Sequence, residues 1–355
     1  MKVGILTFHQ ANNYGAVLQC YALMSFLKDK GVDANVLDYC PDFLKKERNN
    51  VWSSIGKKIK AYLRFFLCWF FSKGEVEHID GFDFFRKNAI SPVPMSMAEQ
   101  MDAVVCGSDQ IWNTKICGEL DPVFFALPFH HCRKISYAAS NGSVALSDEE
   151  KRQFVCSLKN FDHISVREVS LQQQLSDLGI NSEIVLDPVL LAGSQSFEEI
   201  VTPIRQKRPY VLIYELTHLD RTYELAHLIA RQLKADLVVI GGGVKAYLKC
   251  GFINKQGLTP AQFVSYFKHA ACVVTTSFHG TAFSLVYERP FYSMKMNMNK
   301  DDRILSLLSS LDLMSRSVGD LFGFVYSEVD YVEVNYKLNV LRGKSANFLV
   351  EALYK

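Results

Sequence analysis

The chain has 355 residues, of which 49% are hydrophobic and 21% charged, and its formal net charge at pH 7 is +2. This composition is typical of a globular protein long enough for two domains with a core in each, and it excludes a disordered or fibrous chain. A balance this close to neutral also argues against nucleic acid as a bulk electrostatic partner.

The nine cysteines are spread along the chain without a C-x-x-C pair, and several of them lie inside apolar runs. We interpret them as reduced core residues of a cytoplasmic protein. The first residues, MKVGILTFH, follow a strand pattern and lack the cleavage features of a signal peptide, which agrees with that interpretation.

Strand-like and helical patterns alternate through the first half of the chain. The predicted strands cover residues 2–8, 35–39, 102–106, 134–139, 161–166 and 182–186. A helix is predicted at 15–28, and a helical insertion occupies 41–90. Alternation of this kind indicates βα units and a mostly parallel sheet with helices on both faces.

One segment of the insertion, WSSIGKKIKAYLRFFLCWFF (52–71), combines four basic residues with a dense aromatic end. It is too short and too charged to span a bilayer. It could lie in the headgroup region as an amphipathic helix, which would place the protein peripherally at the inner face of the membrane. The alternative is a core helix whose aromatic side chains pack under a neighbouring loop.

The second half of the chain repeats the alternation after a polar stretch at 192–208, which is typical of a linker or a surface excursion between domains. Strands are predicted at 210–214, 236–240 and 272–274, and helices at 219–233, 259–269, 280–288 and 334–355. We therefore predict an α/β protein with mostly parallel sheets and two Rossmann-like domains, 1–195 and 205–355, facing a cleft. The last helix could cross back onto the first domain. In such sheets, ligands bind beyond the carboxyl ends of the strands.

The loop after the first predicted strand, FHQANNYGAVLQ, is rich in amides but does not match the G-x-G-x-x-G fingerprint. A dinucleotide is therefore not indicated. Asn12 and Asn13 could hydrogen-bond sugar hydroxyls or a phosphate, or they could form a plain turn, since Asn and Gly are common in turns.

The segment GSDQIWN (107–113) follows the strand at 102–106. Asp109 and Gln110 are predicted to project into the mouth of the cleft, where a carboxylate could act as the general base for a hydroxyl. Trp112 could stack on a sugar ring, although a tryptophan at this spacing also suits the core.

Arg167 follows the strand at 161–166 and is suited to bidentate recognition of a phosphate or carboxylate. Its alternative role is a salt bridge, to Glu168 or to a surface partner. Asp187, which ends the next predicted strand, is interpreted as a helix cap or turn residue. We predict no metal site, because the adjacent pair His130-His131 diverges and has no third ligand at helical spacing.

His279 lies within VVTTSFHGTAFSLVYERPF (273–291), where an apolar strand becomes a helix. At such a turn, backbone N–H groups and the positive end of the helix dipole favour an anion. The alternative is a histidine that is hydrogen-bonded in the core.

Taken together, seven stretches of the chain resemble the polysaccharide pyruvyl transferase family, in the family's order. They are TFHQANNYGAVLQCYAL (7–23), DAVVCGSDQIWN (102–113), ISYAASNG (135–142), ISVRE (164–168), VLDPVLL (185–191), TTSFHGTAFSLVYERPF (275–291) and DDRILSLL (301–308). The resemblance implies a fold like that of GT-B glycosyltransferases. It also implies transfer of the pyruvyl group of phosphoenolpyruvate onto two hydroxyls of a sugar, with no further cofactor. The products would be a cyclic ketal in a surface polysaccharide (an exopolysaccharide or capsule) and free phosphate.

By resemblance, Arg167 is the arginine that binds phosphoenolpyruvate, His279 the catalytic histidine and Asp109 the acidic residue of the first domain. The turn of His279 then includes Ser277 and Gly280 as substrate-binding residues. Ser277 is a departure, because many members carry Arg-Leu-His where this chain has Ser-Phe-His.

The cation missing at position 277 has three candidate replacements in this chain, Lys295, Arg303 and Arg289. Without a replacement, the donor would differ or activity would be lost. With the donor site empty, His279 should be neutral, and a bound anionic donor should favour its charged form. It could then donate a proton to the donor or hold its anion.

Two alternatives remain open from the residues. The first is a glycosyltransferase that uses a nucleotide-sugar, for which Glu288, Asp301 and Asp302 are candidate polar contacts. The second is a non-catalytic saccharide-binding relative, which the serine at position 277 favours. The sequence does not name the sugar acceptor or say whether it is lipid-linked.

Overall fold

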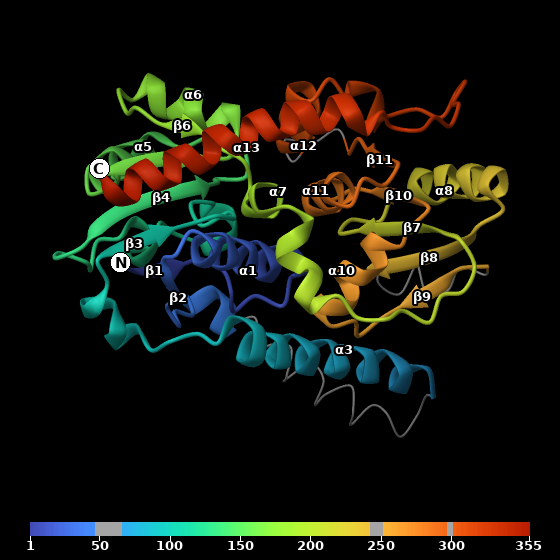
Figure 1. The fold of residues 1–355 in the computed structure, drawn as a ribbon, viewed down its shortest axis with the longest axis horizontal. Helices are drawn as coiled ribbons and strands as arrows, with labels where there is room; N and C mark the ends of the chain where they lie inside the picture. The colour runs from blue at the N-terminus through green and yellow to red at the C-terminus, as the bar shows by residue number, and fades with distance from the viewer. Residues whose placement is uncertain (47–65, 242–250, 297–300) are drawn as a thin grey trace. The chain divides into compact units, whose positions relative to one another are not determined.

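The computed structural model describes residues 1–46, 66–241, 251–296 and 301–355. These residues form two compact units, which are described separately. Unit 1 consists of Met1–Leu191, Gly257–Pro260 and Ser345–Lys355, and unit 2 of Ala192–Gln256 and Ala261–Lys344 (Figure 1).

Unit 1 is built on a parallel six-stranded sheet with the order β2-β1-β3-β4-β5-β6. Its strands are β1 (Lys2–Leu6), β2 (Asp33–Val36), β3 (Ala103–Cys106), β4 (Arg133–Ala139), β5 (His163–Val166) and β6 (Glu183–Ile184). All four residues of β3 are buried, as expected for a central strand covered on both faces. The chain passes from β1 to β2 on one side and then to β3 on the other, so the direction of winding reverses between β1 and β3.

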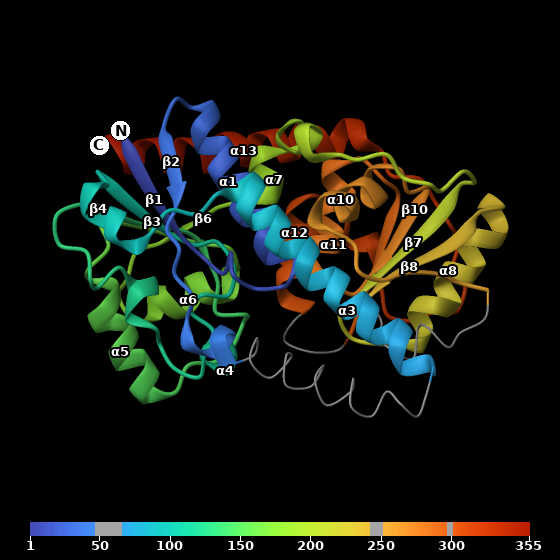
Figure 2. The same ribbon diagram turned by 90° about the horizontal axis from the view of Figure 1, so that it is seen from below.

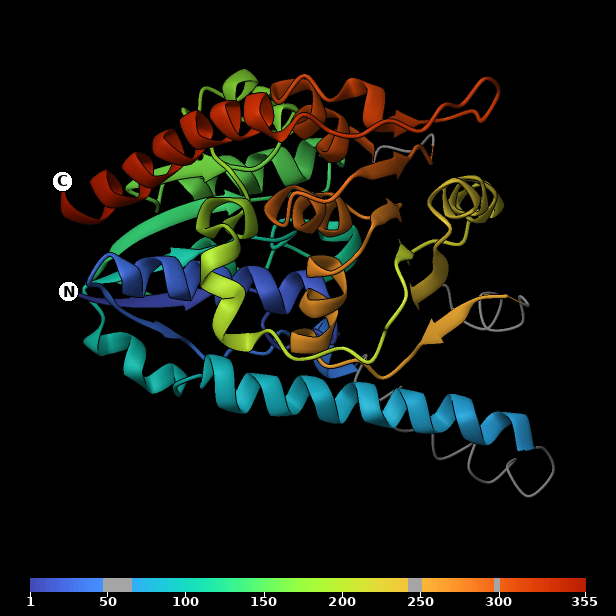
Figure 3. The same cartoon turned by 45° about the vertical axis from the view of Figure 1, so that its right-hand side comes forward.

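The helices of unit 1 follow from local signals. They are α1 (Tyr14–Asp29), α3 (Phe66–Phe85), α4 (Thr114–Cys117), α5 (Asp148–Leu158), α6 (Val169–Asp177) and α7 (Pro188–Ala192). Asn13 caps α1, and Ser147 and Glu150 form a reciprocal capping box at α5. A single long helix, α3, accounts for part of the predicted insertion (Figure 3).

The segment predicted as a membrane-surface or core helix, 52–71, lies largely outside the described residues, and only 66–71 belong to α3. Within the described ranges, no helix is long and apolar enough to cross a membrane.

Unit 2 is built on a second parallel six-stranded sheet, with the order β12-β11-β10-β7-β8-β9. Its strands are β7 (Tyr210–Glu215), β8 (Asp236–Gly241), β9 (Ile253–Lys255), β10 (Cys272–Thr275), β11 (Phe291–Met294) and β12 (Ser317–Val318). Read from β9, the third, second, first, fourth, fifth and sixth strands of the unit lie side by side, which is the Rossmann order. The winding reverses between β7 and β10, which Figure 2 shows as neighbours in the sheet.

The helices that accompany this sheet are α8 (Asp220–Leu233), α10 (Pro260–Lys268), α11 (Phe278–Val286) and α12 (Asp301–Ser310). The last helix, α13 (Tyr331–Tyr354), contributes its first part to unit 2 and its last part to unit 1. In unit 2 the hydroxyl of Tyr331 donates to the carbonyl of Arg289 at 2.6 Å, and in unit 1 the Leu186 N–H donates to Ser345 Oγ at 2.9 Å.

The two Rossmann-like α/β units with parallel sheets agree with the fold predicted from the sequence. The three strands β9, β11 and β12 were not predicted from the sequence.

Candidate functional site

Each sheet has one position where ligands are expected, namely the carboxyl edge at which the winding reverses. In unit 1 this edge carries the loops after β1 and β3, and the Thr7 hydroxyl joins them by donating to the Ser108 carbonyl at 3.0 Å. In unit 2 it carries the loops after β7 and β10, joined by the Leu216 N–H, which donates to Thr276 Oγ1 at 3.3 Å. Asp109 lies in the first pair of loops, and His279 lies in the first turn of α11, the helix that follows the loop after β10.

Asp109 is held in the left-handed region of backbone space, with φ +73°, and its residue surface is 8% exposed. Its Oδ1 accepts the Gln110 N–H at 2.8 Å, and its carbonyl accepts the Ser140 N–H at 3.0 Å. Gly107, two residues before Asp109, has φ +121°, and a Cβ at that position would overlap the carbonyl oxygen of Tyr137. Only glycine therefore allows the loop to run this close to β4.

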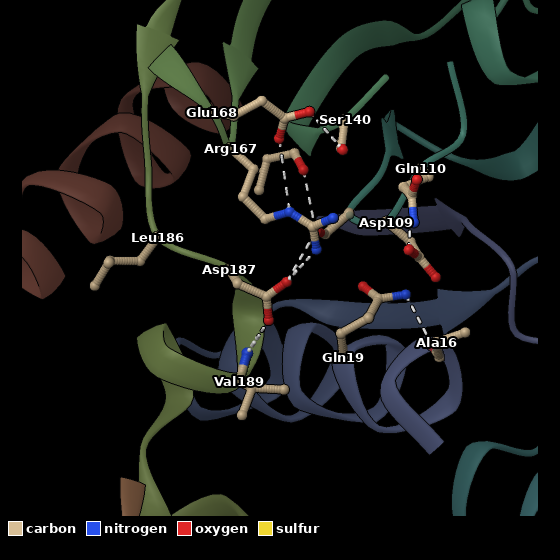
Figure 4. Close-up of polar contacts among 12 residues, drawn as sticks. Ala16, Gln19, Asp109, Gln110, Ser140, Arg167, Glu168, Leu186, Asp187 and Val189 are labelled. Atoms are coloured by element: carbon tan, nitrogen blue, oxygen red, sulfur yellow. Dashed lines mark hydrogen bonds and ion pairs between the residues drawn. The ribbon is translucent and has the colours of Figure 1, made fainter. Parts of the chain in front are cut away.

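Arg167 is buried and ion-paired in unit 1 (Figure 4). Its Nη1 donates to Asp187 Oδ2 at 2.7 Å, while its Nε lies 3.8 Å from Glu168 Oε2. Burial alone would lower the pKa of Arg167, but the charges of Asp187, Glu168 and Asp109 outweigh it and raise that pKa above its ordinary value. The guanidinium is therefore charged.

Asp187 is the main partner of Arg167, which the sequence analysis did not predict. Its Oδ1 accepts the Val189 N–H at 3.0 Å, so the predicted turn role is present beside the ion pair. One signal could have found the pairing. Arg167 and Asp187 follow neighbouring parallel strands, β5 and β6, whose carboxyl ends meet at one edge of the sheet.

Glu168 is fully buried and organises a neighbouring loop more than it binds Arg167. Its Oε1 accepts the Ser140 hydroxyl at 2.6 Å, the Asn141 N–H at 3.1 Å and the Gly142 N–H at 3.2 Å. The sequence SNG at 140–142 is thus wrapped around one carboxylate oxygen, which compensates for the burial of its charge.

The charges of this cluster bear on what it can bind. One guanidinium, that of Arg167, faces the carboxylates of Asp187, Glu168 and Asp109. An added phosphate or carboxylate would meet a surplus of negative charge, whereas neutral hydroxyl groups would meet hydrogen-bond acceptors. The contact of Arg167 with an anionic donor, implied by the resemblance, stays a prediction, and Asp187 already occupies one edge of the guanidinium.

Trp112 lies in the core of unit 1, and its predicted stacking on a sugar is wrong for this conformation. Its ring is stacked on Phe125 with centroids 5.4 Å apart and meets the edges of Phe154 and Phe161. The residue is 1% exposed, and its Nε1–H donates to the Phe124 carbonyl at 3.2 Å. Both faces of the ring are therefore covered by protein.

Gln110, next to Asp109, is partly exposed and is held by its side chain. Its Oε1 accepts the Asn113 Nδ2–H at 2.8 Å. Gly142 lies so close to both amides that a Cβ there would overlap them.

Asn12 and Asn13 shape the loop after β1. Asn13 Oδ1 accepts the Ala16 N–H at 3.2 Å and so caps α1. Asn12 Oδ1 accepts from Arg86 Nη2 at 2.9 Å, and the Asn12 carbonyl accepts from His78 Nε2 at 3.2 Å. The carboxamide oxygens of Asn12 and Asn13 therefore both accept hydrogen bonds from the protein, which agrees with the alternative role of these residues in a turn.

The sequence analysis missed Arg86 and His78, because the insertion that contains them carries no motif. Burial, followed by the charge of Arg86, lowers the pKa of His78 despite its hydrogen bond to the Asn12 carbonyl, so its imidazole is neutral at pH 7. The two side chains link α3 and the short helical segment after it to the predicted ligand-binding loop.

His279 is the second residue of α11 and is 9% exposed. Its ring meets Phe278 edge to face, with centroids 5.4 Å apart. Ser277 occupies the N-cap position, but its side chain makes no capping bond within the described residues, and its N–H donates to Thr275 Oγ1 at 3.0 Å. The histidine thus lies in the first turn of a nine-residue helix, where the dipole is positive.

Gly280 allows α11 to approach β10. A Cβ at this position would overlap Thr275 Oγ1, which donates to the Tyr214 carbonyl at 2.6 Å. The glycine at position 280, which was predicted to form part of a substrate-binding turn, is therefore also explained by the packing of α11 on β10.

Three cations were candidates to replace the arginine missing at position 277. The Arg303 guanidinium on α12 lies 6.0 Å from the centroid of the Phe278 ring, adjacent in sequence to His279. Lys295 follows β11 directly and is half-buried. Arg289 lies beyond the opposite end of α11, about 13 Å from its start at 1.5 Å per residue, so it is wrongly placed for this role.

Two of the carboxylates that were candidate contacts to a nucleotide-sugar form hydrogen bonds within the protein. Asp301 is buried, and its two oxygens accept the Met296 N–H at 3.2 and 3.0 Å. Glu288 lies beyond the carboxyl end of α11, where its Oε1 accepts from Asn335 at 2.8 Å. Within the described residues, no group of three His, Cys, Asp or Glu side chains is placed to hold a metal ion.

Comparison with solved structures places the fold in the GT-B class. One similar structure is assigned as a UDP-N-acetylglucosamine 2-epimerase from Listeria monocytogenes, with 10% identity, a TM-score of 0.50 and coverage of 99% of this chain and 90% of that one. Another is an E. coli heptosyltransferase with ADP-2-deoxy-2-fluoro heptose, with 14% identity, a TM-score of 0.40 and coverage of 83% and 88%.

The sequence itself matches the family described as polysaccharide pyruvyl transferase over residues 13–296, and the chain belongs to that family. It is thus a member of a transferase family of polysaccharide biosynthesis, which implies a saccharide acceptor. A search among curated proteins finds no match.

Proposed function

We propose that the protein transfers the pyruvyl group of phosphoenolpyruvate to two hydroxyls of a saccharide, forming a cyclic ketal and releasing inorganic phosphate during synthesis of a surface polysaccharide. The observation that carries this proposal is the position of Asp109 and His279. Each lies at the edge of its own sheet where the winding reverses, and ketal formation requires a base and an acid, roles for which a carboxylate and an imidazole are suited.

The donor half of the reaction is assigned to unit 2. Phosphoenolpyruvate carries a phosphate and a carboxylate, and the first turn of α11 with Arg303 and Lys295 offers positive charge for them. His279 would donate a proton to the methylene carbon, which leaves an oxocarbenium-like centre on the adjacent carbon. The negative charge of the donor favours the protonated imidazole that this step requires.

The acceptor half is assigned to unit 1. Asp109 would take the proton of the first hydroxyl as its oxygen bonds to the oxocarbenium carbon. The C–O bond to phosphate then breaks and phosphate leaves with the bonding electron pair. The second hydroxyl attacks the same carbon and its proton passes to the released phosphate, while the proton taken up by Asp109 replaces the one that His279 gave to the methylene carbon. The surplus of carboxylates around Asp109 suits a neutral, hydroxyl-rich sugar, and Asn12, Asn13 and Gln110 are proposed contacts to it.

In this proposal Arg167 balances the buried carboxylates beside Asp109. Its rival role, a fork on the phosphate or carboxylate of the donor, predicts that variants of Arg167 have a raised KM for phosphoenolpyruvate.

The test uses the full chain with phosphoenolpyruvate and a panel of galactosides and mannosides. We expect release of inorganic phosphate that depends on one of the saccharides, with a ketal product detected by mass spectrometry. His279→Gln and Asp109→Asn serve as controls and should both release far less phosphate. If nucleotide-sugars but not phosphoenolpyruvate raise the melting temperature, the protein is a glycosyltransferase. If neither does, it is a saccharide-binding relative.

We further propose a cytoplasmic location with peripheral membrane contact through residues 52–71, whose basic residues suit anionic lipid. A short soluble acceptor should then be turned over without any lipid.

A further inference from the structure

A chain of buried hydrogen bonds connects helix α1 to the residue before Asp109. Gln19 Nε2 donates to Thr7 Oγ1 at 2.8 Å, and Thr7 Oγ1 in turn donates to the Ser108 carbonyl at 3.0 Å. Gln19 and Ser108 are 0% exposed and Thr7 is 1% exposed. Figure 4 shows Gln19 on α1 below Arg167 and to the right of Asp187, with Asp109 above and to the right of Gln19. The Gln19–Thr7–Ser108 chain, as we call it, therefore runs through the core of unit 1 to the loop after β3.

The chemistry of Gln19 shows which of its atoms matters. Its Nε2 also donates to the Ala16 carbonyl at 2.9 Å, whereas its Oε1 is buried without a hydrogen-bond partner among the described residues. Burying an amide oxygen without a donor costs free energy, and methionine or leucine would fill this space without that cost. The presence of a glutamine at position 19 is therefore explained by the hydrogen bonds that its Nε2 donates, to Thr7 Oγ1 and to the Ala16 carbonyl.

Ser108 is held through its backbone carbonyl and through its side-chain hydroxyl. Its carbonyl accepts from Thr7, while its Oγ lies 3.0 Å from the Ala138 carbonyl and 3.3 Å from Asp187 Oδ2. The Ser108 carbonyl and the Asp109 N–H belong to one rigid peptide plane. Whatever fixes the direction of that carbonyl therefore also fixes the direction of the Asp109 N–H. Because the Asp109 carbonyl is held by the Ser140 N–H at 3.0 Å, the two constraints together restrict φ of Asp109.

Asp109 benefits from such support, because a φ of +73° is uncommon outside glycine, although aspartate adopts it more often than most residues. Residues in such conformations persist where the surrounding structure holds them. We infer that Gln19 and Thr7 are positioning residues, which hold Asp109 in the orientation that its proposed role as general base requires. The inference rests on the proposed function only for that last clause, because the effect on the loop itself can be measured without substrate.

The first experiment measures hydrogen exchange of the backbone amides in residues 109–112. Thr7→Val removes the hydroxyl at nearly constant shape, and Gln19→Met removes the amide that supports it. Both variants should exchange these amides about tenfold faster than the unaltered protein, while Thr7→Ser, which keeps the hydroxyl, should not. Ser136→Ala is the matched control. It removes another buried hydroxyl of unit 1, which donates at 2.9 Å to the Ser165 carbonyl on the neighbouring strand β5. Unchanged exchange in Thr7→Val and Gln19→Met, with normal melting temperatures, would overturn the inference.

The second experiment measures phosphate release with the accepted saccharide. Thr7→Val and Gln19→Met should lower kcat about tenfold or more while leaving KM for phosphoenolpyruvate within about twofold. In an Asp109→Asn background, Thr7→Val should lower kcat no further, because the base it positions is already gone. If exchange is faster but kcat is unchanged, Gln19 and Thr7 do position the loop, but Asp109 is not the general base of the proposed function.

Discussion

The Nη1 atom of Arg167 lies 2.7 Å from Oδ2 of Asp187, and neither side chain is more than 2% exposed. Buried ion pairs of this kind contribute little net stability, because desolvation offsets the attraction, but loss of one partner leaves an uncompensated charge in the core. The pair therefore connects the stability of unit 1 with the electrostatics around Asp109.

We expect Arg167→Met to lower the free energy of unfolding by about 3–5 kcal/mol, because the Asp187 and Glu168 carboxylates would remain buried without their cation. Chemical denaturation of the purified variant measures this. Arg152→Met, which removes the partner of Glu149 in an exposed pair, is the control and should change the stability little. A variant of normal stability with a raised KM for phosphoenolpyruvate would instead support Arg167 as a contact to the donor.

His279→Gln tests the proposed acid. Glutamine keeps a hydrogen-bond donor but removes the titratable proton, so turnover should fall about 10²–10⁴-fold while donor binding survives better. The high-pH limb of the kcat profile should disappear with it. If His279 only holds the phosphate, donor binding should instead weaken by about 1–2 kcal/mol. Near-normal turnover in steady-state assays would exclude both roles.

Gly280→Ala tests the packing of α11 against β10. The added Cβ would overlap Thr275 Oγ1, so we expect the free energy of unfolding to fall by about 1–3 kcal/mol. Thr275→Ala in the same chain should relieve part of this loss, since it removes the overlapping atom. Thermal unfolding of the two single variants and the double variant gives the coupling, and strictly additive losses would contradict the overlap.

His78 predicts a pH dependence of stability. Its pKa in the folded state is below the ordinary value of 6.5, mainly through burial. The unfolded chain therefore binds more protons between that lowered pKa and 6.5, and the folded state loses stability as pH falls through this range. Above 6.5 the stabilisation is fully present.

The free energy of unfolding measured against pH should show this fall in the unaltered protein and less of it in His78→Gln, which keeps a donor for the Asn12 carbonyl. His130→Gln, which removes an exposed histidine in the same way, is the control that shows whether the change is particular to His78. Identical curves for the unaltered protein and His78→Gln would remove His78 as the cause.

Residues 52–71 are tested on membranes. Changing Lys57, Lys58 and Lys60 to glutamate should abolish binding to anionic vesicles, because each basic residue near the surface contributes about 1 kcal/mol. The turnover of a short soluble acceptor should not change. If the unaltered protein fails to float with anionic vesicles, the segment is a core helix instead.

Local patterns in the sequence determined much of this protein. The alternation of apolar strands with helices predicted two parallel α/β units, because β-branched runs and helical periodicity are properties of short windows. The turns that contain Asp109, Arg167 and His279 were found in the same way, from polar residues that follow an apolar run. The family resemblance rested on those turns and agrees with the match over residues 13–296.

Only the tertiary structure decided which of these residues meet. Asp187 pairs with Arg167 because β6 lies beside β5, and Arg303 reaches the Phe278 ring because α12 packs near the start of α11. The same holds for Trp112, whose ring could have faced a ligand or the core until Phe125 and Phe154 were placed around it. Strand order and helix packing join residues far apart in the chain, and a periodicity that is read within a short window carries no information about them.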